Sequence, residues 1–257
     1  MVREIFKNIM SLLAKWAIKK HQMSIIVVSG WYGTEITREF VYTVLKTKYA
    51  VRRNLKNPWW DLSFPLAILG YADYQRNWIE WLGLIIKAVV RLILGGRHKH
   101  YIVLNINYSN LETIKYWSRF IKPGYLIITG YKKNYGFIDT LIANTIINKG
   151  KILYNQKNKI LLKETFKNYQ KTYSFGAEKN DMSLHIEQNS VSTIYSCLGD
   201  TITVRKNILP SINNEIIASS LLMGKIKKID LTEGLYAIIK YGLPKRLITQ
   251  IKANLKV

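Results

Sequence analysis

The segment at residues 24–30 (SIIVVSG) constrains the fold of this chain more than any other part of the sequence. Its β-branched run is typical of a strand that is buried on both faces of a sheet, and Gly30 ends the run. A helical pattern follows from residue 34 to about residue 48. A strand, a glycine turn and a helix in this order form the usual first unit of a doubly wound nucleotide-binding sheet, with the turn at the carboxyl edge.

The alternation of strands and helices continues along the chain and favours a parallel sheet with helices on both faces. Further strands are predicted at 101–109, 125–131 and 151–155, and helices at about 110–121, 137–149, 214–224 and 231–241. From about residue 170 the pattern changes to short strands with turn signals between them. The predicted fold class is therefore α/β, a doubly wound, mostly parallel sheet with a small antiparallel extension.

Residues 1–22 are predicted to form an amphipathic lead-in helix ahead of a domain at 23–257. The apolar residues of this helix share one stripe: Ile5, Ile9, Leu12, Leu13 and Trp16. The stripe could pack against the domain or lie on a membrane surface. We favour packing, because apolar stripes usually face a core.

A second strongly apolar helix is predicted at 77–94. Its charges, Glu80, Lys87 and Arg91, recur at spacings of seven and four and form a narrow polar stripe. Its longest uncharged run is far shorter than the roughly 20 residues that cross a bilayer. We therefore predict a mostly buried or interfacial helix, and no transmembrane segment in the chain.

The formal net charge of +23 implies attraction to polyanions, such as nucleic acid, an anionic bilayer surface or phosphate-bearing metabolites. A solvated basic surface accounts for the same charge, so the charge alone does not choose a partner. The single cysteine, Cys197, excludes an intramolecular disulfide, and no leader pattern is visible at the N-terminus. We expect a cytoplasmic location, with peripheral contact to the inner face of the membrane as a further option.

Several segments occur in an order and spacing that resemble one family. They are LLAKWAIKKHQMSIIVVSG, GWYGTEITREFVYTVL, NLKNPWWDLSFPLAILGY, IKPGYLIITGY, KILYNQKN and LPSINNEIIASSLLMG followed by YGLPKR. This order is similar to the central, ATPase-type domain of the Mur ligases, and closest to the MurF branch, which adds D-alanyl-D-alanine to the UDP-linked peptidoglycan precursor. The resemblance implies a central domain at 23–257, without the family's N-terminal UDP-binding domain or its C-terminal ligase domain.

In that family the phosphate loop reads G-x-x-G-K-[ST], whose backbone N–H groups and lysine hold the ATP phosphates while the hydroxyl binds Mg²⁺. Gly30 and Gly33 match the two glycines, whereas Thr34 replaces the lysine and Glu35 replaces the hydroxyl. Thr34 is expected to cap the helix, and Glu35 suits its positive end. We expect the loop to be structural, with Arg38 as the nearby cation that could compensate.

The metal-binding groups of the family are also missing. Its Mg²⁺-binding glutamate corresponds to Asn105, which we expect to satisfy backbone groups at a strand end. The family's histidine after the third strand is absent, and the helix at 137–149 has no lysine before its end, so a two-metal site cannot be assembled. Asn155, Asn214 and Arg246 fall where the family has residues near the nucleotide.

The resemblance therefore implies a vestigial nucleotide site, to which we assign no catalytic residue and no metal ligand. Its members are Gly30, Gly33, Thr34, Glu35, Asn155, Asn214 and Arg246. Other chemistries have weaker support, because Cys197 has no adjacent histidine and is expected to be a structural thiol. The four histidines have no metal-ligand spacing: His21, His98, His100 and His185.

Three functions remain open. The first is a non-catalytic Mur-ligase-like binding or scaffold protein, linked to peptidoglycan precursor synthesis, with no cofactor and with a protein partner in cell-wall synthesis or an anionic ligand. The second is a divergent ATP-dependent amide ligase that uses Mg-ATP and works with a partner chain. The third is a basic peripheral membrane or nucleic-acid binder, with nucleic acid the less favoured ligand. Its aromatic candidates are Trp16, Trp31, Tyr32, Trp59 and Trp60.

Overall fold

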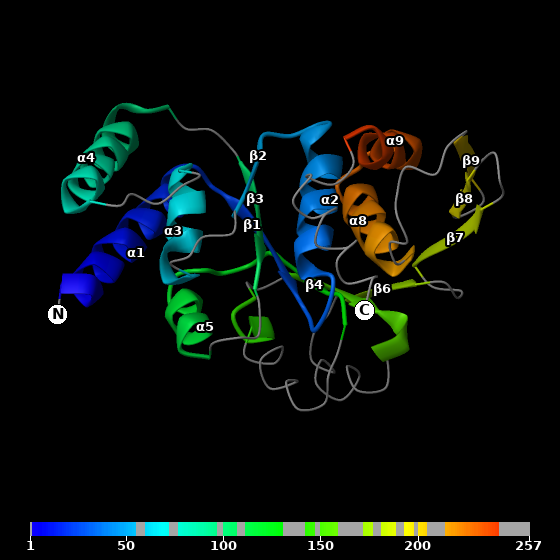
Figure 1. Ribbon diagram of the computed structural model, residues 1–257, viewed down its shortest axis with the longest axis horizontal. Helices are drawn as coiled ribbons and strands as arrows, with labels where there is room; N and C mark the ends of the chain where they lie inside the picture. Colours follow the sequence, from blue (N-terminus) through cyan, green and yellow to red (C-terminus); the bar gives the residue numbers. More distant parts are fainter. Residues whose placement is uncertain are drawn as a thin grey trace.

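The computed structural model describes most of the chain. The described residues are 2–54, 60–71, 77–96, 100–106, 111–130, 142–146, 150–158, 172–176, 181–188, 193–197, 200–204 and 214–241. One sheet crosses the molecule and helices cover both of its faces (Figure 1).

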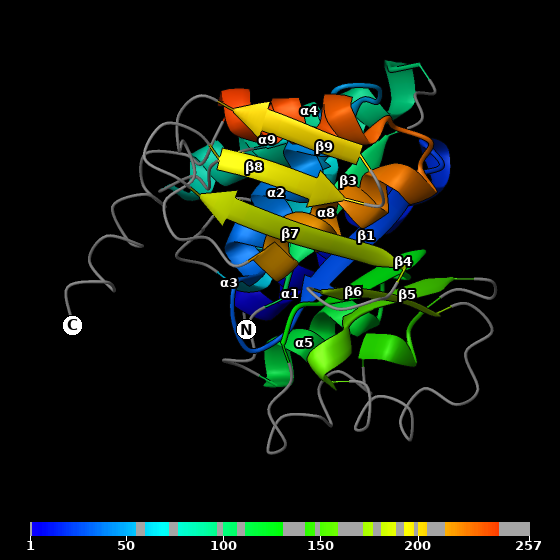
Figure 2. The same cartoon turned by 90° about the vertical axis from the view of Figure 1, so that its right-hand side faces the viewer.

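The sheet has the order β2-β3-β1-β4-β5-β6-β7-β8-β9. Its strands are β1 (Ser24–Ser29), β2 (Val51–Arg53), β3 (Tyr101–Asn105), β4 (Tyr125–Ile128), β5 (Lys151–Asn155), β6 (Thr172–Gly176), β7 (Met182–Gln188), β8 (Thr193–Cys197) and β9 (Asp200–Val204). Pairing is parallel from β2 through to β7, whereas β8 and β9 pair antiparallel, at the edge seen in Figure 2. The predicted fold class is confirmed, with the antiparallel part beginning only after β7.

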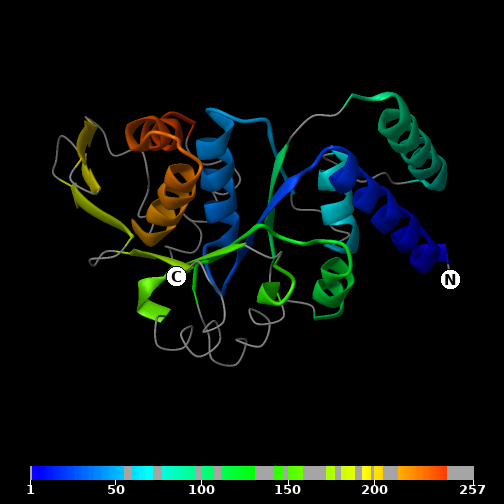
Figure 3. The same ribbon diagram turned by 180° about the vertical axis from the view of Figure 1, so that it is seen from behind.

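The helices form one layer on each face of the sheet (Figures 1 and 3). Their bounds are α1 (Val2–Lys20), α2 (Thr34–Lys46), α3 (Trp60–Leu69), α4 (Trp78–Leu94), α5 (Leu111–Ser118), α8 (Asn214–Ile226) and α9 (Leu231–Tyr241). On one side lie α1, α3, α4 and α5, and on the other lie α2, α8 and α9. Of the helix predicted at 137–149, only residues 142–146 fall within the described part.

The central strand β1 shows why the sheet needs both layers. Ile25 and Val27 point into the core beneath α1 and α3, whereas Ile26 and Val28 point into the core beneath α2 and α8. All four side chains are at most 2% exposed. Successive strand residues face opposite sides, so an uninterrupted apolar run requires cover on both.

The lead-in helix α1 packs by a different face from the one predicted. Its buried residues are Met10, Leu13, Ala14 and Ala17, of which the two alanines allow a close approach to α3. The predicted packing stripe, apart from Leu13, faces outward: Ile5, Ile9, Leu12 and Trp16. The preference for packing was therefore wrong for these four residues, because the small side chains that make contact carry little weight in an apolar pattern.

Helix α4 lies against α1 through Trp81, Leu84, Ala88 and Leu92. The ring of Trp81 meets Phe6 of α1 edge-on, with 4.6 Å between ring centroids. Among the described residues, no helix has the length and apolar character needed to span a bilayer.

Candidate functional site

The glycine loop after β1 lies where β1 and β4 run side by side, at the carboxyl edge of the parallel sheet. The chain order reverses here, and open α/β sheets bind ligands at such a switch point. Gly30 has φ +135° and Gly33 has φ +69°, conformations that side chains other than glycine rarely adopt. A Cβ on Gly30 would lie 2.8 Å from the Gly130 nitrogen after β4, so the two loops require glycine there for contact.

The loop is fixed to the segment after β4 by main-chain and side-chain hydrogen bonds. The Trp31 nitrogen donates to the Gly130 carbonyl (3.0 Å), and the Thr129 hydroxyl donates to the Tyr32 carbonyl (2.5 Å). These bonds hold the loop in one conformation against the neighbouring strand end.

Helix α2 begins directly after the loop, at Thr34. Its N-cap is Gly33, whose carbonyl accepts the first helical hydrogen bond from Thr37 (2.8 Å), and no side chain caps the helix. The prediction that Thr34 is the cap is wrong, because Thr34 already occupies the first helical position. Glu35 lies in the first turn as expected, near the positive end of the helix.

The side chain of Tyr32 reaches from the loop across the carboxyl edge. Its ring covers Gly130, where any Cβ would overlap it. The Tyr32 hydroxyl donates to Glu215 Oε2 and accepts from Asn155 Nδ2, each at 3.4 Å. Burial and the Glu215 carboxylate raise the pKa of Tyr32. The loop therefore makes side-chain contact with β5 and with the first turn of α8.

Asn155 and Glu215 complete this arrangement, which we call the Tyr32 cluster: Tyr32, Asn155, Lys157 and Glu215. Asn155 is fully buried at the end of β5 and accepts from the Lys157 nitrogen (3.0 Å). Glu215 is 4% exposed, and its Oε1 lies 2.7 Å from the Lys157 ammonium. Glu215 was missed as a site residue, although its position beside Asn214 at a predicted helix start was a usable signal. Tyr32 was predicted only as an aromatic candidate for membrane or nucleic-acid binding.

A second buried network lies on the other side of the loop, beneath α2. Arg38 is 1% exposed and donates to Asn105 Oδ1 (2.6 Å) and to Glu39 Oε1 (2.6 Å). Glu39 also pairs with Arg53, with 2.8 Å between Oε2 and Nε. Burial lowers the pKa of Arg38, and the Glu39 carboxylate opposes this shift. An arginine guanidinium stays charged in proteins at neutral pH.

Asn105 thus has a different role from the one predicted. Its amide oxygen accepts from Arg38, and its backbone nitrogen donates to Asn54 Oδ1 (3.0 Å). The expectation that its side chain satisfies backbone groups is wrong, because a buried guanidinium lies within reach at the strand end. Arg38 in turn is bound to protein groups on the β3 side of the loop.

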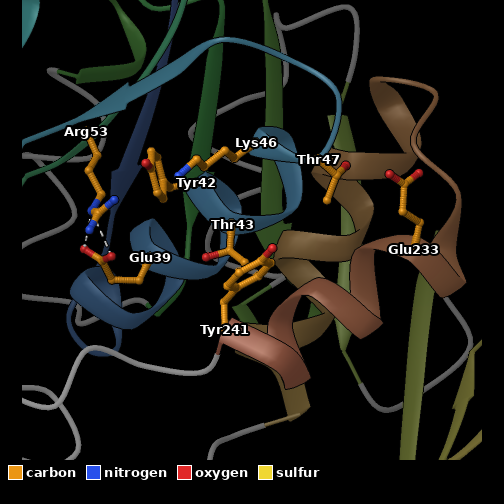
Figure 4. A pocket seen from close by; sticks show the side chains of 8 residues that line it. All are labelled: Glu39, Tyr42, Thr43, Lys46, Thr47, Arg53, Glu233 and Tyr241. Atoms are coloured by element: carbon orange, nitrogen blue, oxygen red, sulfur yellow. Dashed lines mark hydrogen bonds and ion pairs between the residues drawn. The ribbon is translucent and has the colours of Figure 1, made fainter.

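A pocket of about 480 Å³ runs along the outer side of α2, away from the loop (Figure 4). Its lining residues are Glu39, Tyr42, Thr43, Lys46, Thr47, Arg53, Glu233 and Tyr241. It begins at Glu39, about 8 Å along the helix axis from Thr34 at 1.5 Å per residue. The Arg53 guanidinium lies 3.9 Å from the centre of the Tyr42 ring at this end. The pocket is therefore distinct from the glycine loop.

The structure brings together most of the predicted site. The loop residues lie at the switch point, Asn155 contacts Tyr32, and Asn214 is the first residue of α8, next to Glu215. Arg246 and His98 lie outside the described residues, as do Trp59 and the side chain of Cys197. His21 and His100 are neighbours, with 5.9 Å between ring centroids. Within the described part, no three His, Cys, Asp or Glu side chains form a group that could hold a metal ion.

The fold is similar to that of solved Mur ligases. A MurF ligase from Thermotoga maritima in complex with ADP superimposes with a TM-score of 0.67 at 20% identity, over 88% of this chain and 51% of the other. The UDP-N-acetylmuramate:L-alanyl-gamma-D-glutamyl-meso-diaminopimelate ligase from Neisseria meningitides gives 0.57 at 13% identity, over 87% of this chain and 68% of the other. An FPGS complex with AMPPCP and folate gives 0.55 at 12% identity, over 94% and 68%.

These similarities define a Mur-ligase-like α/β fold. The chain spans about half the length of the MurF structure from Thermotoga maritima. No family model and no curated protein sequence matches the chain.

Proposed function

We propose that this chain is a Mur-ligase-like domain that has lost ATP hydrolysis and acts as a binding or scaffold protein in peptidoglycan precursor synthesis. The observation that carries the proposal is the Tyr32 cluster. Tyr32 covers Gly130 and reaches Glu215, so the loop that would hold phosphates contacts protein groups instead.

The residues at the loop do not fit a nucleotide triphosphate. A helix N-terminus favours anions, but no lysine is present between Gly30 and Glu35. Glu35 adds negative charge in the first turn of α2, whereas the Glu215 carboxylate is paired with Lys157. A carboxylate about 5 Å from a phosphate charge, at an effective dielectric constant of about 20, is unfavourable by about 3 kcal/mol per unit charge.

The residues at the end of β3 do not fit Mg²⁺ either. The family's carboxylate is replaced by Asn105, and the oxygen of this amide accepts from the Arg38 guanidinium. A fixed positive charge at that oxygen repels a divalent cation, which prefers carboxylate ligands. We therefore derive no catalytic step through Mg-ATP.

The link to peptidoglycan precursor synthesis is supported by the similarity to MurF and to the Neisseria ligase. The competing proposal is a divergent ATP-dependent ligase that receives missing groups from a partner chain. It is supported by the ADP in the MurF structure. The two proposals differ in whether this chain binds Mg-ATP.

Thermal unfolding with and without Mg-ATP tests the proposal. A ligand at one hundred times its Kd stabilises by about 2.7 kcal/mol, which corresponds to a rise of roughly 5–10 °C in Tm for a domain of this size. We expect no dose-dependent rise for the wild type. The double variant Thr34→Lys/Glu35→Thr, which restores the family's loop residues, is the matched control. Mg-ATP should raise its Tm. A saturable rise for the wild type, with release of ADP when UDP-linked precursors and amino acids are added, would favour the ligase.

A further inference from the structure

Two helices at one end of the molecule expose apolar stripes to solvent. On α1 the stripe comprises Ile5, Ile9, Leu12 and Trp16, and on α4 it comprises Ile79, Leu82, Ile86, Val90, Ile93 and Leu94. The steps of three and four residues place each set on one helical face. We call the two stripes together the α1–α4 surface.

These stripes are separate from the faces that hold the helices to the domain. Helix α4 is packed through Trp81, Leu84, Ala88 and Leu92, on the side opposite its exposed stripe. An ordinary surface helix is polar on its outer face, and monomeric soluble proteins rarely expose a large contiguous apolar patch. The outer face of α4 is therefore apolar and exposed, and the buried residues that pack α4 against the domain lie on its other face.

The two stripes belong to neighbouring, fixed helices. The Phe6 and Trp81 rings join the N-terminal parts of α1 and α4, and the Lys20 ammonium donates to the carbonyls of Leu92 and Ile93 at the C-terminal parts. The helices thus run in the same direction, side by side, at the end of the molecule away from β9 (Figures 1 and 3).

The charges around the surface are mostly positive. Together α1 and α4 carry seven lysines and arginines and two glutamates. Lys15, Lys19, Lys87 and Arg91 are exposed on the same two helices. With a net charge of +23 on the chain, an apolar face with a basic border is complementary to anionic phospholipid, in which cations meet headgroups and apolar side chains enter the acyl boundary.

We propose that the α1–α4 surface docks the protein on an anionic phospholipid bilayer, with both helices lying in the plane of the interface. Trp16 is 41% exposed on this surface and is suited to the boundary between headgroups and acyl chains. The surface is remote from the Tyr32 cluster, so docking does not depend on whether the loop binds a nucleotide.

Co-sedimentation of the full chain with vesicles tests this proposal. The probes are vesicles of phosphatidylcholine alone and of phosphatidylcholine with phosphatidylglycerol, at low and at moderate salt. We expect binding to the anionic vesicles that persists at moderate salt, because the apolar contribution is not screened. Binding to anionic vesicles that disappears at moderate salt would show that only nonspecific charge attraction is involved, and it would overturn the proposal. No binding to anionic vesicles at either salt concentration would also overturn it.

The variant Leu12→Ser/Ile86→Ser/Ile93→Ser removes three exposed side chains of the surface and should weaken binding at least tenfold. The matched control is Tyr236→Ser, because Tyr236 is 53% exposed on α9 and lies outside the surface. It should bind like the wild type, and both variants should keep the wild-type circular dichroism spectrum. Equal binding by the triple variant and the wild type would overturn the proposal. So would a dimer in vesicle-free sedimentation that the triple variant abolishes, because the surface would then be a contact between copies.

Discussion

The Tyr32 cluster and the α1–α4 surface differ from what is usual at their positions: the first is filled where a ligand site is expected, and the second is apolar where a polar surface is expected. At the carboxyl edge of the sheet, where open α/β folds bind ligands, Tyr32, Asn155 and Glu215 bind one another. On the outside of α1 and α4, where a surface is normally polar, large apolar side chains are exposed. A scaffold can therefore bind its partners through a surface other than the cleft that its fold usually provides. In this protein we place the binding surface on two helices.

The largest expected effect tests whether the network beneath the loop is structural. Arg38→Ala leaves Asn105 without its buried guanidinium partner and leaves Glu39 with Arg53 alone, and removing one member of a buried pair costs about 3–5 kcal/mol. Urea unfolding at neutral pH measures the loss. Arg53→Ala is the control, because Arg53 is 24% exposed and its removal leaves Glu39 paired with Arg38. Similar losses for the two variants would show that the buried Arg38 stabilises the fold no more than the partly exposed Arg53 does.

The second prediction separates the two faces of α4. Leu84→Ala removes a buried side chain that is 3% exposed, and such truncations cost about 2–5 kcal/mol. Leu82→Ser changes a neighbour that is 48% exposed, and it should alter the free energy of unfolding by no more than about 0.5 kcal/mol. Chemical denaturation of both variants gives the comparison. A large loss for Leu82→Ser would mean that the exposed stripe supports the fold, and it would remove the basis for docking.

A third, smaller effect concerns the loop backbone. Gly33→Ala places a Cβ at φ +69° and 2.6 Å from Ile216 Cδ1, so it should destabilise by about 1–3 kcal/mol. Gly83→Ala in α4 meets no atom within 4 Å and should stabilise by about 0.5–1 kcal/mol, since alanine is the better helix former. Thermal unfolding distinguishes these opposite signs. A neutral Gly33→Ala would indicate that the loop relaxes easily.

The smallest effect is that of the Tyr32 hydroxyl. Tyr32→Phe should cost about 0.5–1 kcal/mol at neutral pH, the usual net value of a hydrogen bond. Burial and Glu215 raise the pKa of Tyr32, so the folded state keeps the phenol proton to higher pH than the unfolded chain does. This contribution is present below the ordinary tyrosine pKa of about 10 and is lost as pH rises through the raised value.

The advantage of the wild type over Tyr32→Phe should therefore shrink as pH rises from about 10, the ordinary tyrosine pKa, through the raised pKa of Tyr32. Urea unfolding across this range measures the difference. Tyr236→Phe, on an exposed part of α9, is the control and should follow the wild type. A constant difference across the range would show that Tyr32 does not titrate differently in the two states.

Much of the fold was predictable, because apolar periodicity reports burial directly. The run at residues 24–30 required a central strand, and its alternating side chains do enter both cores. The glycine turn after β1 was also predicted from the sequence, and the close approach of Gly30 to Gly130 explains why no side chain is tolerated there. The stripe on α1 led to a wrong prediction, because periodicity identifies an apolar face but does not show whether another element covers it.

The sequence alone was enough to predict the α/β class, the glycine turn at a strand end and the absence of a lysine from residues 30–35. These features depend on local pattern or on residue identity at one position. The contacts of Tyr32 with Glu215 and of Arg38 with Asn105, and the exposure of the stripes on α1 and α4, could be seen only in the folded structure. Tyr32 and Glu215 are 183 positions apart, and Arg38 and Asn105 are 67 apart. Such contacts arise because packing the two helical layers onto one sheet fixes which side chains face each other and which face outward.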